Sequence, residues 1–264
     1  MNRCKTPLRY PGGKSKATKK LFEYFPPLMT YEEYREPFLG GGSVAIAVTK
    51  ARPDMKIWVN DLYWPLYNFW VHLRDQGDTL SNALAYTKKH YDTPDKAREL
   101  FELAKRELTD RDVTDIEKAI NFWIVNKCSF SGLTESSSFS ESASRINFTL
   151  RGIEDLKYYS KLIKNWRITN VGYENLLNEP MENGFVYLDP PYEISSALYG
   201  RKGSHHKTFS HDLFAERCGS HFDDYDMAIS YNADDSVRIR YPNWEHIVFP
   251  LTYTMRSNSA NYRK

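Results

Sequence analysis

The sequence has few cysteines, no long hydrophobic run and almost no excess of charge. Its three cysteines, Cys4, Cys128 and Cys218, are odd in number, lie far apart and form no C-x-x-C pair. This pattern excludes a disulfide framework and gives no sign of a zinc site. No apolar stretch approaches the length of a bilayer span, and the first ten residues lack the apolar stretch of a secretory signal. We therefore expect a cytoplasmic protein.

The charge of the chain is close to balanced. Its 264 residues carry a formal net charge of +2, with 41% hydrophobic and 27% charged residues, as in an ordinary soluble globular protein. Nucleic-acid affinity comes largely from neutralised phosphates, so such a chain would bind DNA or RNA only through local basic patches. Basic residues gather at 14–20, 157–164 and 256–264, although each group alone is more typical of a solvated helix face.

Hydrophobic periodicity divides the chain into three stretches. Strand-like runs at 34–38 and 56–61 flank a glycine cluster and a helical segment, which predicts a βαβ unit. Residues 65–127 have helical periodicity, and strand-like runs return at 167–171, 185–190, 227–231 and 246–251. The pattern predicts an α/β fold in which one sheet domain is split by a helical insertion.

Residues 129–145 contain eight serines, a composition typical of a flexible linker. Phe130, Leu133 and Phe139 are interleaved with these serines, and a strand-like pattern resumes at 147–150. A hairpin, or a loop that becomes ordered on a ligand, is therefore an equal alternative.

The glycine cluster directly follows a strand and opens a helix. Gly40, Gly42 and Ala45 satisfy the G-x-G-x-x-G/A dinucleotide pattern, and Asp61 ends the next strand 21 residues after Gly40. A carboxylate there can accept hydrogen bonds from both hydroxyls of a ribose. The combination favours a nucleoside-type ligand, but it does not distinguish a nicotinamide cofactor from S-adenosylmethionine.

The strand at 185–188 runs directly into Asp189-Pro190-Pro191-Tyr192. Open α/β sheets place their active sites at the carboxyl ends of the strands. The two prolines fix the backbone, so the Asp189 carboxylate and the Pro190 carbonyl become two rigid acceptors beside Tyr192. This arrangement suits a planar amino group. When both N–H groups of the amine donate hydrogen bonds to these acceptors, the nitrogen lone pair becomes localised. By itself the block would also be consistent with a strand-ending turn.

Two further patterns resemble known sites only in part, although Gly12 and Gly13 could bring backbone N–H groups and Lys14 close to a small carboxylate. Gly12-Gly13-Lys14-Ser15 resembles the end of a phosphate-binding loop, but Leu8 stands where the first glycine is required. His205, His206 and His211 lie in polar, loop-like surroundings without cysteines, which are more typical of a mobile segment near the active site than of a metal site. We expect no metal.

Taken in order, several blocks resemble the Dam-type DNA adenine methyltransferases of bacteria and phages. They are Arg9 to Lys14, Glu36 to Ser43, Asn60-Asp61, Asp189 to Tyr192, Asn126 to Leu133 and the terminal Arg256 to Ser259. The resemblance implies a seven-stranded, Rossmann-like S-adenosylmethionine-dependent methyltransferase sheet. It also implies a catalytic domain at 1–64 and 150–264, with an inserted helical and hairpin domain for DNA target recognition at 65–149.

The resemblance also implies roles for particular residues. The cofactor S-adenosylmethionine would be bound by Tyr10, Lys14, Phe38, Gly40, Asp61 and Asp189. The catalytic block would be Asp189, Pro190, Pro191 and Tyr192. Contacts to DNA would come from Lys127, Ser129, Phe130, Ser131, Arg145, Arg256 and Asn258.

The activity implied is methylation of the 6-amino group of adenine in double-stranded DNA, with the base flipped out of the helix. GATC is the family's commonest target, but Lys127, Ser131 and the serine- and glutamate-rich segment depart from the family pattern and leave the recognition sequence open. A role in maintenance, restriction–modification or phage protection stays open too. We expect a monomer without an obligate protein partner, with positive charge along the insertion and the C-terminal arm and negative charge around the cofactor pocket.

Three alternatives remain at this stage. A nicotinamide-dependent dehydrogenase would use the glycine loop and Asp61, but it would leave residues 189–192 without a role. Methyltransferases acting on RNA or on protein glutamine also handle planar amino groups, although they mostly carry asparagine where this chain has Asp189. A catalytically silent DNA-binding module would not need the intact 189–192 block.

Overall fold

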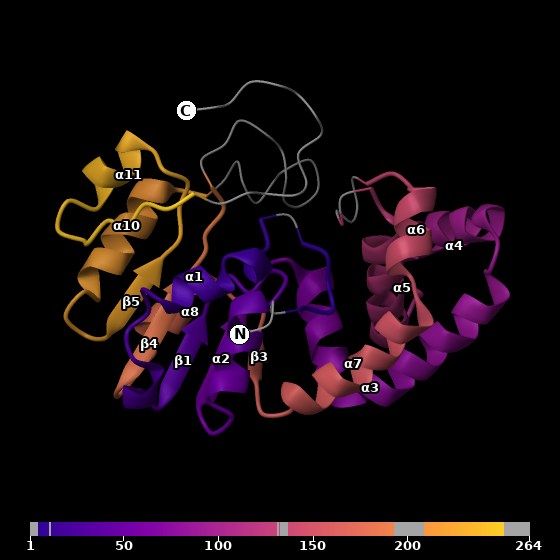
Figure 1. The fold of residues 1–264 in the computed structure, drawn as a ribbon, viewed down its shortest axis with the longest axis horizontal. Helices are drawn as coiled ribbons and strands as arrows, with labels where there is room; N and C mark the ends of the chain where they lie inside the picture. Colours follow the sequence, from indigo (N-terminus) through magenta and orange to yellow (C-terminus); the bar gives the residue numbers. More distant parts are fainter. Residues whose placement is uncertain (1–4, 11, 131, 133–136, 193–208, 251–264) are drawn as a thin grey trace.

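The computed structural model describes residues 5–10, 12–130, 132, 137–192 and 209–250. Within them the chain forms a sheet with helices on both faces and, beside it, a group of long helices (Figure 1). The α/β fold with a parallel sheet that the sequence predicts is confirmed.

The sheet has five strands in the order β3-β2-β1-β4-β5, and all neighbouring pairs are parallel. The strands are β1 (Glu33–Glu36), β2 (Lys56–Asn60), β3 (Arg167–Thr169), β4 (Gly184–Leu188) and β5 (Asp226–Ile229). Strands β2 and β3 lie on one side of β1, and β4 and β5 lie on the other side. The order of the strands therefore reverses between β1 and β4. Ligands bind outside the carboxyl ends of the strands at such a switch point.

The central strand β4 explains why both faces of the sheet are covered. All its residues are buried, as expected for a parallel strand between two helical layers. Phe185 and Tyr187 belong to the large core shared with α2, whereas Val186 and Leu188 pack in a second core with Phe214 of α10. Successive side chains of β4 therefore stabilise opposite layers.

The helices near the sheet are short. They are η1 (Lys14–Lys16), α1 (Thr18–Phe22), η2 (Leu28–Thr30), α2 (Ser43–Ala51), α8 (Tyr173–Asn178), α10 (His211–Ser220) and α11 (Asp235–Arg240). Helix α2 starts directly after Gly42, which has a left-handed φ of +67°. Its first turn therefore opens at the carboxyl end of β1, where the backbone N–H of Ala45 donates a hydrogen bond to the Glu36 carboxyl.

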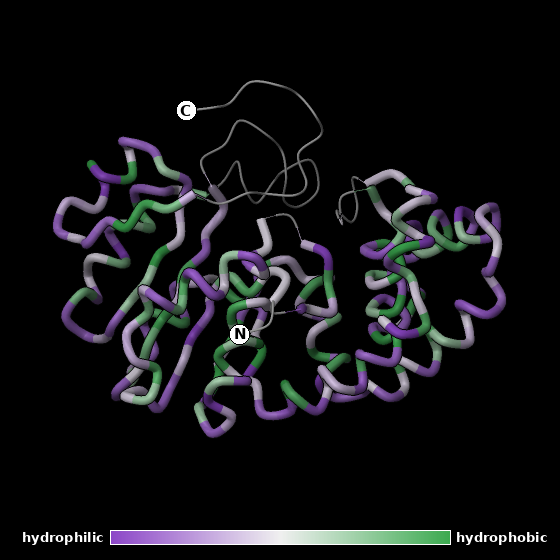
Figure 2. Tube along the Cα trace, in the orientation of Figure 1, coloured by the Kyte–Doolittle hydropathy of each residue, from purple (hydrophilic) through white to green (hydrophobic). Residues whose placement is uncertain are grey.

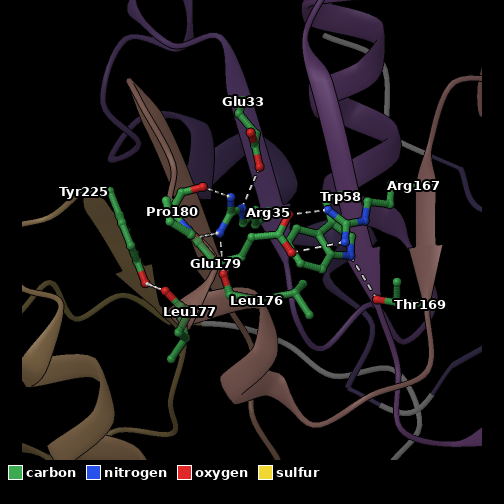
Figure 3. Close-up of polar contacts among 10 residues, drawn as sticks. All are labelled: Glu33, Arg35, Trp58, Arg167, Thr169, Leu176, Leu177, Glu179, Pro180 and Tyr225. Atoms are coloured by element: carbon green, nitrogen blue, oxygen red, sulfur yellow. Dashed lines mark hydrogen bonds and ion pairs between the residues drawn. The ribbon is translucent and has the colours of Figure 1, made fainter.

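A buried arginine on β1 holds the end of α8 in place (Figure 3). The Arg35 guanidinium donates hydrogen bonds to the carbonyls of Leu176, Glu179 and Pro180, at 2.5, 2.6 and 2.9 Å. It also pairs with the Glu33 carboxylate at 2.6 Å. The bonds anchor α8 to the sheet, and α8 begins at the carboxyl edge, near the end of β3.

The second part of the molecule consists of α3 (Trp64–His90), α4 (Pro94–Glu107), α5 (Asp115–Cys128), α6 (Glu141–Asn147) and α7 (Leu150–Leu162). Thr93 caps α4 with Pro94 at its first position, and Thr114 and Glu117 form a capping box at α5. Hydrophobic residues dominate α2, as Figure 2 shows, and α5 carries the fully buried Phe122 and Trp123. Helices α3 to α7 follow one another along the chain, and α7 packs along α3, so this helical part continues to Leu162, beyond the boundary expected at 149.

Two runs that were expected to form strands do not, and the serine-rich segment contains a bridge between two of its residues. The run 246–250 forms no strand, since Ile247 and Val248 are 40% and 64% exposed and only Phe249 stacks, on Tyr24. The strand-like pattern at 147–150 is also wrong, because these residues end α6 and begin α7. In the serine-rich segment, Ser129 and Phe139 form an antiparallel bridge, as at the base of a hairpin. Of the seven strands that the resemblance implies, the described residues contain five.

Candidate active site

A pocket of about 300 Å³ lies at the carboxyl edge of the sheet. It is formed by the segment around Tyr10, the ends of β1, β2 and β4, and the residues that follow β3. All cofactor and catalytic residues expected from the sequence line it: Tyr10, Lys14, Phe38, Gly40, Asp61, Asp189, Pro190, Pro191 and Tyr192. Segments almost 180 residues apart in sequence thus share one cavity.

The glycine loop and Asp61 are joined directly. Gly40 donates its backbone N–H to Oδ2 of Asp61 at 2.9 Å, and the backbone N–H of Tyr63 donates to Oδ1 at 3.0 Å. Gly40 has a φ of +50°, and a Cβ at this position would lie 3.0 Å from the Tyr10 ring. The loop therefore needs glycine both for its backbone conformation and for the close approach of Tyr10.

Lys14 and Asp189 form an ion pair at the floor of the pocket. The Nζ of Lys14 lies 2.7 Å from Oδ1 and 2.6 Å from Oδ2 of Asp189, and it also donates to the carbonyl of Gly12 at 3.2 Å. The Lys14 side chain is 4% exposed and that of Asp189 is 21% exposed. Each carboxylate oxygen keeps a second lone pair, so Asp189 can accept hydrogen bonds from a ligand as well as from Lys14.

Tyr192 completes this corner of the pocket. Its ring centroid lies 4.9 Å from Nζ of Lys14 and 6.2 Å from the ring of Tyr231, which follows β5. The ammonium of Lys14 therefore contacts both the carboxylate and the aromatic face. The side chains of the 189–192 block are held by two elements, the N-terminal segment and the end of β5.

Glu36, which was not among the expected site residues, is a further acidic group in the pocket. It ends β1, is 2% exposed and accepts a hydrogen bond from the hydroxyl of Tyr34 at 2.7 Å. Burial raises the pKa of its carboxyl to about 8, and the negative charge of Asp189 adds to the effect while Lys14 opposes it. Its position at the end of the first strand, inside the block Glu36 to Ser43, is the signal that could have identified it.

An aromatic wall closes the side of the pocket next to β3, and it joins the expected Phe38 to two residues that were not expected, Tyr173 and Phe209. Phe38 lies 5.5 Å from Tyr173 and 5.9 Å from Phe209, measured between ring centroids, and all three line the cavity. Tyr173 is the first residue of α8, whose other end Arg35 fixes. No sequence pattern marks Tyr173 or Phe209, because only the packing of α8 and α10 brings them to Phe38.

The pocket's segments, in this order along one chain, match the pattern of a known family. The family model of the D12 class N6 adenine-specific DNA methyltransferases matches residues 10–248. The chain belongs to this family. A curated relative is the Type II methyltransferase M.MjaIII of Methanocaldococcus jannaschii, which is 24% identical over 197 residues, covering 70% of this chain and 68% of the relative. The chain is thus an adenine-specific DNA methyltransferase.

D12-class methyltransferases use S-adenosylmethionine, and the residues of the pocket fit this cofactor. Four acidic residues line the pocket, Glu36, Asp61, Glu174 and Asp189, and they suit a ligand that carries a sulfonium and an ammonium. The aromatic wall suits an adenine ring, and Asp61 at the end of β2 is positioned as in a nucleoside site. The same acidic set agrees with the negative charge expected around the cofactor.

The residues expected to contact DNA have varied surroundings in this methyltransferase. Phe130 is 67% exposed and Arg145 is exposed, whereas Ser129 is fully buried with its hydroxyl donating to the carbonyl of Asn126. Lys127 is buried too, and burial together with the positive charge of Arg9 lowers its pKa to about 7. Ser131, Arg256 and Asn258 lie outside the described residues.

The expected positive charge of the insertion is wrong for the segment as a whole, since acidic residues outnumber basic ones over 65–149. Several acidic residues occupy first turns of helices, such as Asp95 of α4 and Asp115 and Glu117 of α5, where the helix dipole favours them. The C-terminal arm lies outside the described residues.

The described part of the chain contains no group of side chains suited to a metal ion. His211 lies in α10, where its Nδ1 is 2.9 Å from the hydroxyl of Tyr231, while His205 and His206 are not described. None of the described helices is long and apolar enough to cross a membrane.

Proposed function

We propose that this D12-class enzyme flips an adenine out of duplex DNA and methylates its 6-amino group at a short specific site, with GATC as the first candidate. The observation that carries the proposal is the shared pocket. Asp189, Pro190 and Tyr192 line the same cavity as Gly40, Asp61 and Glu36. A nucleoside-binding set and an acceptor set for a planar amino group therefore face one space.

The cofactor would be oriented by the loop and the strand ends. When bound, S-adenosylmethionine supplies a methyl group on a positively charged sulfur. Asp61 would accept hydrogen bonds from the ribose hydroxyls at the end of β2, beside those that its carboxylate accepts from the backbone N–H groups of Gly40 and Tyr63. Glu36 and Asp189 would hold the cationic end, and Phe38 and Tyr173 would contact the adenine ring.

The target amine would be polarised at the other side of the cavity. The two N–H groups of the amine would donate hydrogen bonds to the Asp189 carboxylate and the Pro190 carbonyl, which turns the nitrogen lone pair toward the methyl group. Stacking on Tyr192 contributes about 1–3 kcal/mol, against a cost of roughly a few kcal/mol for extruding the base. A base is needed only after transfer, because the amine becomes acidic once it is methylated.

Contacts to the duplex would come from the residues around the end of α5 and from α6. Phe130 and Arg145 are exposed, and they join Lys127, Ser129, Ser131, Arg256 and Asn258 in the proposed DNA-contact set. We propose that the enzyme acts as a monomer. The non-basic hairpin segment implies that specificity depends on a few base contacts rather than on a broad phosphate grip.

Purified protein and labelled S-adenosylmethionine test the proposal. Duplexes with GATC, with the same bases in scrambled order, and with N6-methyladenine already at the target are compared, and 2-aminopurine at the target adenine reports flipping by its fluorescence. We expect label in the GATC duplex and a fluorescence rise there. Label in RNA or protein instead of DNA, or tight nicotinamide binding without S-adenosylmethionine binding, would overturn the proposal. Equal labelling of the scrambled duplex would overturn the GATC assignment alone.

A further inference from the structure

The side-chain amide of Asn126 connects the end of α5 to the N-terminal segment. Asn126 is 0% exposed and lies in the last turn of α5. Its Oδ1 accepts the backbone N–H of Arg9 at 2.9 Å, and its Nδ2 donates to the carbonyl of Arg9 at 2.6 Å and to that of Gly132 at 2.9 Å. One amide thus binds both polar groups of a backbone residue 117 positions away.

The side chain of Arg9 makes further hydrogen bonds to residues that follow α5. Its guanidinium donates to the carbonyl of Ser129 at 2.8 Å through Nη1 and to that of Phe130 at 3.2 Å through Nη2. Gly132 has a φ of +73°, and a Cβ there would lie 2.6 Å from the Arg9 carbonyl. We call Asn126, Arg9 and the carbonyls of Ser129, Phe130 and Gly132 the Asn126 clamp.

The clamp lies one residue away from the cofactor pocket. Tyr10 follows Arg9, and its ring and Cβ pack against Gly40 and Gly41 so closely that a Cβ on either glycine would lie within 3.0 Å of Tyr10. The backbone N–H of Gly13 donates to the carbonyl of Tyr10, and Lys14 then reaches Asp189. The segment from Arg9 to Lys14 is therefore fixed at one end by the clamp and at the other by the ion pair.

The opposite side of the clamp holds Phe130. The bonds from Arg9 and Asn126 fix the backbone on both sides of this residue, whose ring is 67% exposed. Phe130 is in the proposed DNA-contact set. A single set of hydrogen bonds thus joins a segment that lines the pocket and the exposed side chain of Phe130.

From this geometry we infer that Asn126 is a positioning residue that couples binding of the cofactor to binding of DNA. The inference rests on the proposed function of the pocket. A ligand that orders Tyr10 and Lys14 also fixes Arg9, and through the clamp it fixes the backbone of Phe130. By linkage, DNA that engages Phe130 strengthens cofactor binding by the same factor.

The chemistry of the clamp requires an amide. Asparagine offers one acceptor and two N–H donors, and the three backbone groups around it are one donor and two acceptors. Alanine would leave those backbone groups without their partner, and aspartate would place a carboxylate against two carbonyl oxygens. In the Arg9→Lys variant the backbone half of the clamp remains, but the forked contact to two carbonyls is lost.

The test measures the coupling factor itself. It is the ratio of the DNA Kd without and with S-adenosylhomocysteine, determined by fluorescence anisotropy on a duplex that the wild-type enzyme methylates. We expect a wild-type factor of about 5 or more, the lower end of ordinary coupling. The Asn126→Ala and Arg9→Lys variants should each bring it close to 1, with a larger rise in KM for DNA than fall in kcat.

Asn121→Ala is the matched control. Asn121 also lies in α5 and is nearly buried, but its amide donates to the Glu107 carboxylate within the helical part. It should lower the melting temperature while keeping the wild-type coupling factor. If Asn126→Ala does not fold, Arg9→Lys still decides, because the backbone bonds to Asn126 stay in place.

The inference is overturned if folded Asn126→Ala or Arg9→Lys keeps the wild-type factor, if Asn121→Ala abolishes it, or if the wild-type factor is itself 1. Methylation by the wild-type enzyme is measured in the same preparation. Its absence would refute the proposed function, whereas methylation with unchanged coupling in the variants would refute the clamp alone.

Discussion

Replacing Asp189 with alanine should damage both the chemistry and the stability of the enzyme. The carboxylate is one of the two proposed acceptors for the target amine, so its removal should lower the rate of methyl transfer by roughly 100-fold or more. It is also the partner of Lys14, whose side chain is 4% exposed. The alanine variant therefore leaves a buried ammonium without its counter-ion.

The cost of that unpaired charge can be worked out from the pair. Removing one member of a buried ion pair costs about 3–5 kcal/mol, and the 21% exposure of Asp189 places this pair at the lower end, about 3 kcal/mol. For a chain of this length each kcal/mol lowers the melting temperature by about 2 °C, so a fall of about 6 °C is expected. Removing the cation as well, in Lys14→Met with Asp189→Ala, should restore most of the melting temperature but none of the activity.

Thermal melts and single-turnover methylation of a duplex measure the two effects separately. Lys20→Met is the matched control, because the Lys20 pair with Glu23 is exposed and its loss should leave the melting temperature unchanged. If the single and double variants melt at the same temperature, the unpaired ammonium of Lys14 is not what lowers the melting temperature of Asp189→Ala. Near-normal transfer in Asp189→Ala would contradict the role of the carboxylate in catalysis.

Three further predictions concern the same pocket. The pKa of Glu36 is raised to about 8 in the folded protein but stays near 4.5 in the unfolded chain. The free energy of unfolding should therefore fall by on the order of a few kcal/mol as the pH rises from 4.5 to about 8. Thermal melts of Glu36→Gln across this pH range should lack that fall. A cationic cofactor beside Glu36 should displace its proton, so calorimetry at pH 7 in buffers of different ionisation enthalpy should detect proton release that Glu36→Gln abolishes; equal release by the variant would contradict the assignment. Gly40→Ala should weaken S-adenosylmethionine binding about tenfold and cost roughly 1–2 kcal/mol of stability. The reason is that Gly40 has a φ of +50° and that the new Cβ would lie 3.0 Å from the Tyr10 ring. Unchanged affinity would show that the loop is not in the cofactor site.

The fold was predictable where each segment has a clear period. The five strands follow short apolar runs, and residues 65–127 have the spacing of amphipathic helices. The run at 246–250 misled because its apolar residues have no neighbouring strand within the described sheet and lie at the surface. Residues 147–150 misled because two helix ends, with Thr149 as the cap of α7, resemble a short alternating strand.

The pocket was predictable where residues lie in the glycine loop and at strand ends, as Gly40, Asp61 and Asp189 do. Tyr173 and Phe209 reach Phe38 only through tertiary packing of α8 and α10, which no local pattern records. The two halves of the Asn126 clamp lie in the blocks Arg9 to Lys14 and Asn126 to Leu133, but no local pattern records that a buried amide bonds to a backbone 117 residues away. The burial of Lys127, which lowers its pKa, was hidden for the same reason.

The most direct test of the central claim is to map modified bases in DNA from a host that lacks its own adenine methyltransferases and expresses either the wild-type chain or Asp189→Ala. Nucleoside mass spectrometry gives the modified base, and modification-sensitive sequencing gives its context. We expect N6-methyladenine at one short recurring sequence with the wild-type enzyme and far less of it with the variant. Unmodified DNA, a modified cytosine, or equal modification with Asp189→Ala would contradict it.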